Sequence, residues 1–292
     1  MNKIRFAANQ DTNYVFHMLA VAKCGYDNEY SAKYCVLYPT EDLSVIKRHE
    51  DLLTVCGGQH CGQLFDLMVS QPACARISAK AYYHGLILLG NEILNGNIPE
   101  YVDKSLIPYT EIIIELSEIM VKHYDNYIET IWEHEKAKIE QYIPELSDLF
   151  ESTLFSEKAE NLVGLLESDS FTATLVTSVA GGAEAIDISN DQDVFGIERT
   201  HTDAFYFIGH EFIIYLLMKA LRHANAFNSF ETWCLTEGLA EYYLKRIMGD
   251  TRFFNQQQQY VAFYEELSNS NSLSASALYE AALEQFINKR NP

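Results

Sequence analysis

His210 and Glu211 stand side by side in an apolar stretch and are residue types that can bind a metal and move a proton. On a helix, residues four apart are separated by about one turn and project from the same face. Two histidines at that spacing can hold one zinc ion, and a glutamate directly after the first can polarise a metal-bound water. Here the position of the second histidine holds Ile214.

A second segment carries two further carboxylates. Glu237 and Glu241 are four residues apart, so a helix would place them on one face. Gly238 and Ala240 are small enough to let this helix approach the His210 helix closely. A carboxylate beside an imidazole can fix the tautomer of the ring.

These two segments together resemble the gluzincin zinc metallopeptidases. The run WCLTEGLAEYY, residues 233–243, is similar to their third-ligand helix, an aromatic and a polar residue followed by Glu-Gly-x-Ala-x-Tyr. The resemblance implies that His210 and Glu237 bind the metal. It also implies that Glu211 is the catalytic glutamate and that Glu241 orients the histidine.

A third part of the resemblance precedes the His210 helix. Gly182-Ala183-Glu184-Ala185 partly matches the Gly-Ala-Met-Glu-Asn element of gluzincin aminopeptidases, which lies on the edge strand that pairs with extended substrate. The match implies a substrate-binding role for Ala183 and Glu184, and an ordinary hairpin is the alternative. The order of hairpin, His-Glu helix and Glu-Gly-x-Ala helix is the gluzincin order, and the resemblance covers roughly residues 171–249.

Because of Ile214, the resemblance supports a prediction of the fold but not a prediction of catalysis. Catalytic zinc in such sites takes three protein ligands and a water, and only His210 and Glu237 remain. No neighbouring side chain is a convincing replacement: those considered are His201, His223 and Tyr215. We therefore expect zinc binding by the usual geometry to be weak or absent.

Two other clusters could be mistaken for chemistry. Cys56-Gly-Gly-Gln-His60-Cys61 has a Cys-x4-Cys spacing outside the usual zinc pattern and no matching second pair, so a turn with incidental thiols is favoured. Without an export signal, the six cysteines are expected to be reduced. The pair His134–Glu135 is interpreted as a chance occurrence in a polar helix with no partner.

The charge of the chain bears on its partners. The formal net charge is −20 over 292 residues, whereas nucleic acids and anionic membranes favour basic surfaces, so we expect neither as a partner. The longest apolar run, residues 205–221, is short for a membrane span and carries charge at its centre. We expect a cytoplasmic protein; the oligomeric state is not predicted.

Hydrophobic periodicity predicts an α+β fold that is mostly helical. A small mixed or antiparallel sheet would pack on the two-helix core that the resemblance implies. Residues 1–165 would form a helical N-terminal region and residues 166–292 the gluzincin-like core. Pro144 is expected to interrupt a long helical region. Strands are expected at residues 3–6, 171–178 and 183–189, and helices at residues 13–22, 77–94, 109–141, 203–222, 236–248, 253–267 and 274–287.

Three interpretations of function stay open. The first is a metallopeptidase-like protein with a degenerate zinc site, catalytically impaired or inactive, that binds a peptide or protein. The second is an active zinc-dependent peptidase with an atypical third ligand. The third is an unrelated helical interaction module. A distance above about 8 Å between the His210 and Glu237 side chains would favour the third, because zinc ligands lie near 2 Å from the ion.

Overall fold

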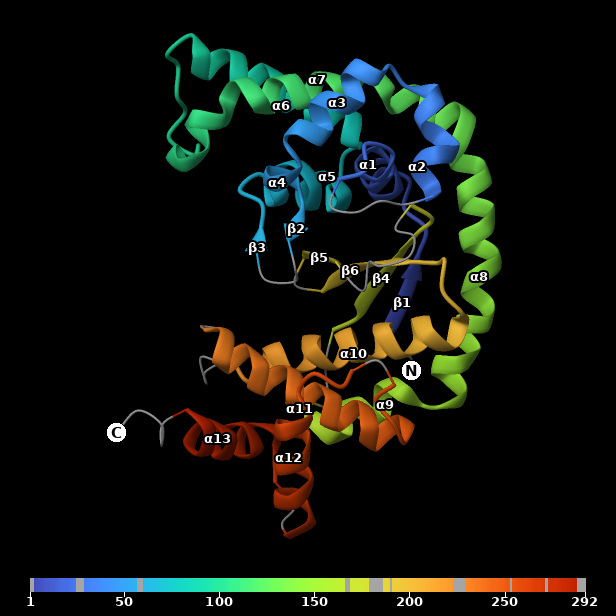
Figure 1. The fold of residues 1–292 in the computed structure, drawn as a ribbon, viewed down its shortest axis with the longest axis vertical. Helices are drawn as coiled ribbons and strands as arrows, with labels where there is room; N and C mark the ends of the chain where they lie inside the picture. Colours follow the sequence, from blue (N-terminus) through green and yellow to red (C-terminus); the bar gives the residue numbers. More distant parts are fainter. Residues whose placement is uncertain are drawn as a thin grey trace. The chain divides into compact units, whose positions relative to one another are not determined.

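The computed structural model describes residues 3–24, 29–56, 60–165, 169–178, 186–189, 191–222, 229–252, 254–270 and 273–287. Most of these residues form helices, and a small four-stranded mixed sheet accompanies them (Figure 1). The expected mostly helical α+β class is therefore confirmed. Within the same residues, no helix is both long and apolar enough to cross a membrane.

Helices dominate the first half of the chain. They are α1 (Gln10–Val21), α2 (Glu29–Tyr34), α3 (Thr40–Arg48), α4 (Glu50–Leu53), α5 (Gln71–Cys74), α6 (Ala79–Leu94), α7 (Thr110–Tyr127), α8 (Glu133–Ser152) and α9 (Phe155–Val163). Short 3-10 or π turns lie among them at η1 (Cys35–Leu37), η2 (Asp66–Ser70), η3 (Lys104–Tyr109) and η4 (Ile128–Trp132). The later helices are α10 (His201–Ala220), α11 (Phe230–Met248), α12 (Gln258–Ser270) and α13 (Ala275–Phe286).

The four-stranded sheet has the order β1-β4-β6-β5. Its strands are β1 (Ile4–Ala7), β4 (Phe171–Val176), β5 (Ile186–Ser189) and β6 (Gln192–Gly196). The strands β5 and β6 pair antiparallel, with Ile186 opposite Val194, and β5 ends the sheet order. A separate antiparallel pair is formed by β2 (Val55–Cys56) and β3 (His60–Cys61).

Two local expectations were wrong. The helix α8 runs through Pro144 instead of ending there. A proline inside a helix removes one backbone hydrogen bond, but Leu146 and Phe150, one turn apart, are fully buried and hold the helix in place. The expected strands also end at residue 189, yet a further strand, β6, begins at Gln192 and buries Val194.

The chain divides into two compact units. Unit 1 consists of Met1–Phe6, Pro144–Ala173 and Thr200–Pro292, and unit 2 of Ala7–Ile143 and Thr174–Arg199. Each unit is therefore assembled from separate stretches of chain. A division into residues 1–165 and 166–292 stays a prediction.

In unit 1, a glycine lets α9 approach α10 closely. A Cβ atom on Gly209 would lie 2.7 Å from the ring of Phe155, nearer than side chains tolerate. Phe155 in turn packs its ring edge against Phe150 and Phe205. The residue before His210 must therefore be small, because the aromatic core of this unit presses on its backbone.

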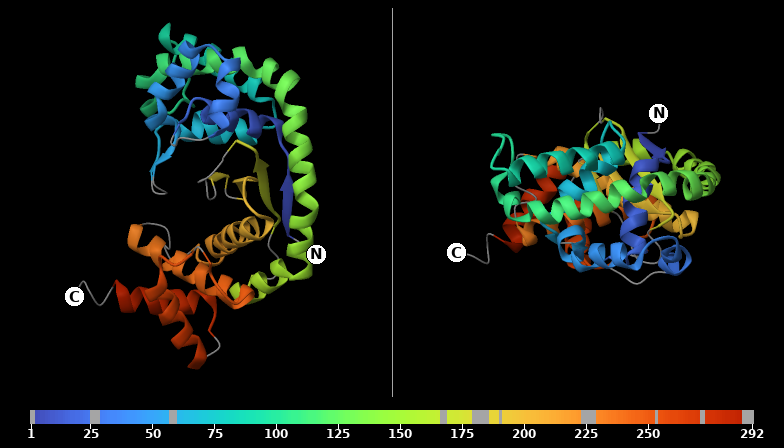
Figure 2. Two further views of the ribbon diagram at one scale, coloured as in Figure 1. Left: turned by 45° about the vertical axis from the view of Figure 1, so that its right-hand side comes forward. Right: turned by 90° about the horizontal axis from the view of Figure 1, so that it is seen from above.

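In unit 2, α6 and α7 form an antiparallel hairpin whose helices lie side by side (Figures 1 and 2). Gly90 sits at their contact, where a Cβ would approach Ile114 to 2.6 Å. The start of α6 is capped by Ser78, whose hydroxyl accepts the Ala81 N–H at 3.2 Å.

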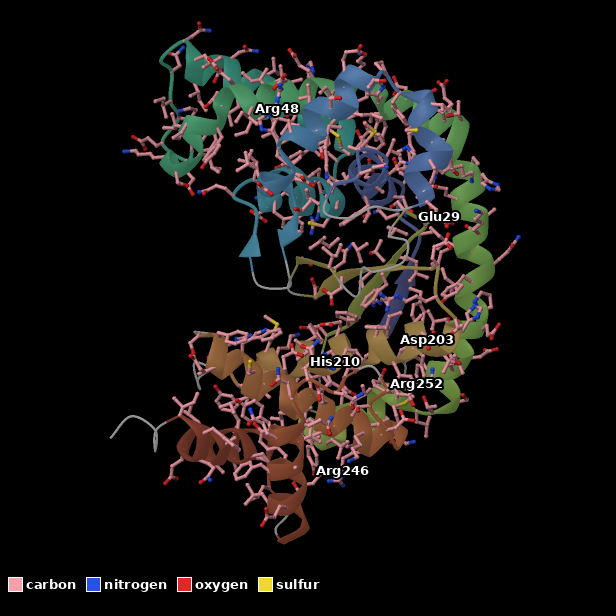
Figure 3. The ribbon with its side chains drawn as sticks, in the orientation of Figure 1. Glu29, Arg48, Asp203, His210, Arg246 and Arg252 are labelled. Atoms are coloured by element: carbon pink, nitrogen blue, oxygen red, sulfur yellow. The ribbon has the colours of Figure 1, made fainter. Side chains whose placement is uncertain are left out.

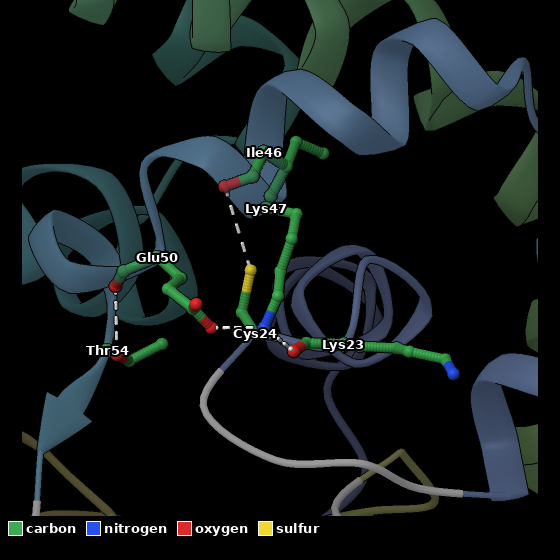
Figure 4. Close-up of polar contacts among 6 residues, drawn as sticks. All are labelled: Lys23, Cys24, Ile46, Lys47, Glu50 and Thr54. Carbon is green, nitrogen blue, oxygen red and sulfur yellow. Dashed lines mark hydrogen bonds and ion pairs between the residues drawn. The ribbon is translucent and has the colours of Figure 1, made fainter.

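The end of α1 is fastened to the α3–α4 corner (Figure 4). The Nζ of Lys47 donates to the Lys23 carbonyl at 2.8 Å and pairs with Glu50. The thiol of Cys24 faces the Ile46 carbonyl at 3.8 Å. Burial raises the pKa of Cys24 to about 12, so this thiol stays neutral and serves packing, not nucleophilic chemistry.

A buried polar network surrounds His17 on α1. Its Nδ1 lies 2.5 Å from the Tyr30 hydroxyl and its Nε2 lies 2.7 Å from the Tyr38 hydroxyl. Burial lowers the pKa of His17 to about 3, so the ring is neutral. Tyr30 donates its single proton to Glu135. The Nδ1–H of His17 must then donate to Tyr30, and Nε2 must accept from Tyr38.

Glu135 anchors this network from α8. It is 1% exposed, and its second oxygen accepts a hydrogen bond from Tyr127 at 2.8 Å. The interpretation of Glu135 as a partnerless residue in a polar helix was therefore wrong. Its partners come from α2 and the end of α7, which periodicity within α8 cannot indicate.

We expect Glu135→Ala to lower the free energy of unfolding by on the order of 3 kcal/mol, because it leaves two buried hydroxyls without an acceptor. Urea denaturation measures this loss. Glu133→Ala changes an exposed glutamate of the same helix and should cost little. Equal losses in the two variants would contradict the role of Glu135.

Candidate functional site

His210 lies in the middle of α10, a helix buried on nearly all sides. The helix begins at His201, two residues before the expected start: the Thr200 hydroxyl accepts the Asp203 N–H at 3.1 Å and caps the first turn. Beyond it, Phe212, Ile213 and Leu216 are fully buried. An apolar helix of this kind holds its few polar side chains inside the protein.

Glu237 and Glu241 lie on α11, which begins six residues earlier than expected from the sequence. Ser229 and Thr232 form a reciprocal capping box: the Ser229 hydroxyl accepts the Thr232 N–H at 3.2 Å, and the Thr232 hydroxyl accepts the Ser229 N–H at 3.0 Å. Thr232 takes the place of the usual Glu or Gln of this motif. The spacing of Ser229 and Thr232 is the signal in the sequence that marks this start.

The small residue Gly238 serves a different contact from the one predicted. A Cβ atom at Gly238 would lie 2.5 Å from the Cβ of Tyr260 on α12. Because Gly238 has no side chain, α12 can pack closely against α11 at this point. The prediction was that Gly238 allows the His210 helix to approach. Ala240, on the same helix, is fully buried.

The structure brings His210 and Glu237 into direct contact. The Nε2 of His210 lies 2.9 Å from the Oε2 of Glu237, and the side chains are 2% and 15% exposed. Two ligands about 2 Å from one tetrahedral zinc would lie about 3.3 Å apart, so this separation is close to that of a ligand pair. The distance above about 8 Å that would favour an unrelated helical protein is not found.

This pair sets the charge of the imidazole. Burial by itself lowers the pKa of His210, but the charge and hydrogen bond of Glu237, with the charges of Glu211 and Glu241, outweigh burial and raise the pKa to about 8. At neutral pH the ring is therefore a cation, and its positive charge balances the carboxylate that it contacts.

The two other predicted carboxylates, those of Glu211 and Glu241, lie near His210. None of the hydrogen bonds described for this site joins either of them to the His210 ring. Burial raises the pKa of Glu241, and the charge of His210 and the backbone N–H groups of Gln257 and Gln256 oppose that rise. Glu241 is 2% exposed. Its Oε2 and the Nδ1 of His210 are buried without a hydrogen-bond partner among the described residues. Glu211 is partly exposed.

The other side chains considered as a third ligand lie elsewhere. Ile214, one turn beyond His210, is partly exposed. His201 begins α10, about 13 Å along the helix axis from His210, and its Nδ1 lies 3.3 Å from Glu145. The Tyr215 hydroxyl donates to the Asp169 carbonyl at 3.1 Å.

Two potential metal donors meet at this site. They are one imidazole and one carboxylate, whereas catalytic zinc takes three protein ligands. Among the residues that the structure describes, no group of three or more His, Cys, Asp or Glu side chains is arranged to hold a metal ion.

Several predicted positions fall outside the described parts of the chain. These are Ala183, Glu184 and His223. The backbone pairs Cys56 with His60 and Val55 with Cys61 in the β2–β3 hairpin, but the side chains of the Cys56–Cys61 cluster are also outside the described part.

Sequence reasoning missed Phe254, which lies between α11 and α12. Its ring is nearly parallel to the His210 ring, with centroids 4.1 Å apart and an interplanar angle of 7°. The sequence analysis expected Phe254 to lie in a helix over residues 253–267, but α12 begins at Gln258. Periodicity along one segment therefore could not indicate its contact with His210.

Comparison with known proteins found no relative of this chain. No family model matches the chain, and neither a curated protein nor a solved structure matches it. The site must therefore be interpreted from its own geometry and from the motif resemblance.

The His210–Glu237 pair predicts a pH-dependent stability. The pKa of His210 is raised from 6.5 to about 8 in the folded state, so its contribution is complete below pH 6.5 and is lost as the pH rises through 8. We expect this loss to be on the order of 2 kcal/mol. Urea denaturation between pH 6 and pH 9 should show it in the wild type and not in His210→Gln.

His84→Gln is a suitable control, because it replaces an exposed histidine of α6 and leaves the pair intact. It should keep the wild-type pH dependence. If His210→Gln also keeps that dependence, His210 is not the cationic partner of Glu237.

Proposed function

We propose that this protein is metallopeptidase-like, with a degenerate zinc site, and that it binds a peptide or protein while its hydrolytic activity is impaired or lost. The observation that carries the proposal is the 2.9 Å contact between His210 and Glu237, the two positions that the gluzincin pattern assigns to metal ligands. Ile214 stands one turn after His210, where that pattern has its second histidine.

The proposal is supported by the charge balance between His210 and Glu237. In a metal site, zinc supplies the positive charge that a carboxylate ligand balances. Here the protonated His210 supplies that charge itself, since its pKa is raised to about 8. Glu237 therefore has a counter-charge without a metal, and zinc would have to displace a proton from His210 to bind. We propose that zinc binding is weak or absent for this reason.

The proposed partner is an extended peptide or a protein segment. An edge strand can accept such a chain through backbone hydrogen bonds, and β5 ends the order of the four-stranded sheet. A cytoplasmic location is part of the proposal. It is supported by the free thiols of Cys24, Cys35, Cys74 and Cys234, which are typical of reducing compartments.

Metal content separates the interpretations of function. Protein purified without chelators should contain substoichiometric zinc, and Ile214→His should restore the third ligand and bring the content to about one zinc per chain. Elemental analysis by mass spectrometry measures both. A peptidase assay on an unstructured protein substrate should show no zinc-dependent cleavage by the wild type.

Two variants serve as controls. Ile214→Gln introduces a polar side chain without an imidazole and should not gain zinc. The double variant I214H/E237Q should lose what Ile214→His gains. Stoichiometric zinc in the wild type would instead favour an active peptidase with an atypical third ligand, and absence of zinc from Ile214→His would favour an unrelated helical module.

A further inference from the structure

One short segment lies against both helices of the site. Residues 254–257, here called the strap, follow α11 and lead into α12. Phe254 covers one face of the His210 ring at 4.1 Å and also meets the Phe207 ring at 5.2 Å, with its plane turned by 67°. Phe207 is three residues before His210, so Phe254 packs on two neighbouring positions of α10.

The far end of the strap contacts α11. The backbone N–H groups of Gln256 and Gln257 hydrogen-bond the carboxylate of Glu241. The strap thus contacts the histidine of one helix with an aromatic face and the buried glutamate of the other with its backbone. His210 and Glu241 are each only 2% exposed.

Polar contacts fix the turn that carries the strap. Arg252 is held in a left-handed conformation with φ of 47°, and its Nη1 donates to Asp203 on α10 at 2.8 Å (Figure 3). Its guanidinium lies 4.8 Å from the centre of the Tyr206 ring. The Asn255 amide donates to the Arg252 carbonyl at 2.6 Å. These anchors hold Phe254 at the position from which it meets His210.

The ion pair among these anchors is weak. The Arg252 and Asp203 side chains are 39% and 27% exposed, and ion pairs at such partly exposed positions contribute little to stability. Its loss would free the Arg252 end of the turn without unfolding the helices beneath it. Release would uncover the His210 ring while the buried faces of α10 and α11 stay packed.

We propose that the strap is a built-in closure of the site and that Phe254 is a positioning residue, which holds the His210 imidazole against Glu237. What the site would bind rests on the proposed function. A flat stack on one face restricts tilting of the ring plane, and in that plane the Nε2 edge lies against the carboxylate. Movement of the strap would open to a peptide or a metal ion the face of the His210 ring that Phe254 covers.

The stack itself is tested by nuclear magnetic resonance of the His210 ring protons, assigned with His210→Gln. Phe254 should shift these protons upfield through its ring current, and Phe254→Leu should abolish the shift while keeping the site covered. Phe254→Tyr keeps the ring and should retain the shift. Unchanged His210 signals in Phe254→Leu would overturn the positioning role.

The closure is tested by carbethoxylation of His210 with diethyl pyrocarbonate, followed by peptide mass spectrometry. We expect Phe254→Ala to raise the modification rate by about tenfold, because the ring no longer needs a local opening to be reached. Phe263→Ala, which alters a phenylalanine that contacts Phe286 on α13, should leave the rate unchanged. A wild-type rate in Phe254→Ala would overturn the closure.

Zinc uptake distinguishes this closure from the function on which it rests. The double variant I214H/F254A should take up zinc faster than I214H. If neither takes up zinc while the modification rate rises as expected, the strap stands and the proposed function fails. If I214H takes up zinc as fast as the double variant and His210 modification is unchanged by Phe254→Ala, the proposed function stands and the strap fails.

Discussion

The hydrogen bond between His210 and Glu237 joins α10 to α11 in an almost fully buried place. An isolated charge there would be costly, and two opposite charges in contact offset much of that cost. The pair is satisfied only if the two helices keep one register. Around it, Gly209 and Gly238 let Phe155 and Tyr260 approach from outside. Unit 1 is thus organised by a polar contact at its centre and by two glycines that allow the surrounding helices to close.

The two units contain buried histidines of opposite character. His17 is surrounded by tyrosine hydroxyls, and burial lowers its pKa to about 3. His210 is surrounded by carboxylates, which raise its pKa to about 8 against the same effect of burial. Burial alone therefore does not decide the charge of a histidine; the ionisation of its neighbours does. The neutral ring of His17 can both donate and accept, whereas a cationic His210 can only donate.

This difference bears on what each cluster can do. The network of His17 and Glu135 joins α1, α2 and α8 through hydroxyl groups whose donors and acceptors are all assigned, which suits a structural role. Among the described residues, the cluster at His210 leaves two buried polar atoms without a hydrogen-bond partner, on His210 and Glu241. Such atoms also occur in unit 2, so the carboxylates gathered around His210 are what mark this cluster as the candidate site. The strap over that site connects its accessibility to the turn between α11 and α12.

The sequence by itself determined the class of fold and the identity of the paired residues. Helical spacing placed His210 and Ile214 on one face, and the resemblance to the Glu-Gly-x-Ala pattern singled out Glu237. Local signals of this kind are strong because they depend on one helix at a time. The sequence also showed Ile214 where the gluzincin pattern has a second histidine, since residue identity at a helical position needs no tertiary information.

Only the tertiary structure decided what those residues meet. Gly238 faces α12 and not α10, α8 continues through Pro144, and Glu135 has two tyrosine partners from other helices. Phe254 reaches His210 from outside any helix. Each of these contacts joins residues far apart in the chain, and no spacing along one segment encodes them. The charge of His210 follows the same rule, because its pKa depends on the carboxylates that folding brings around it.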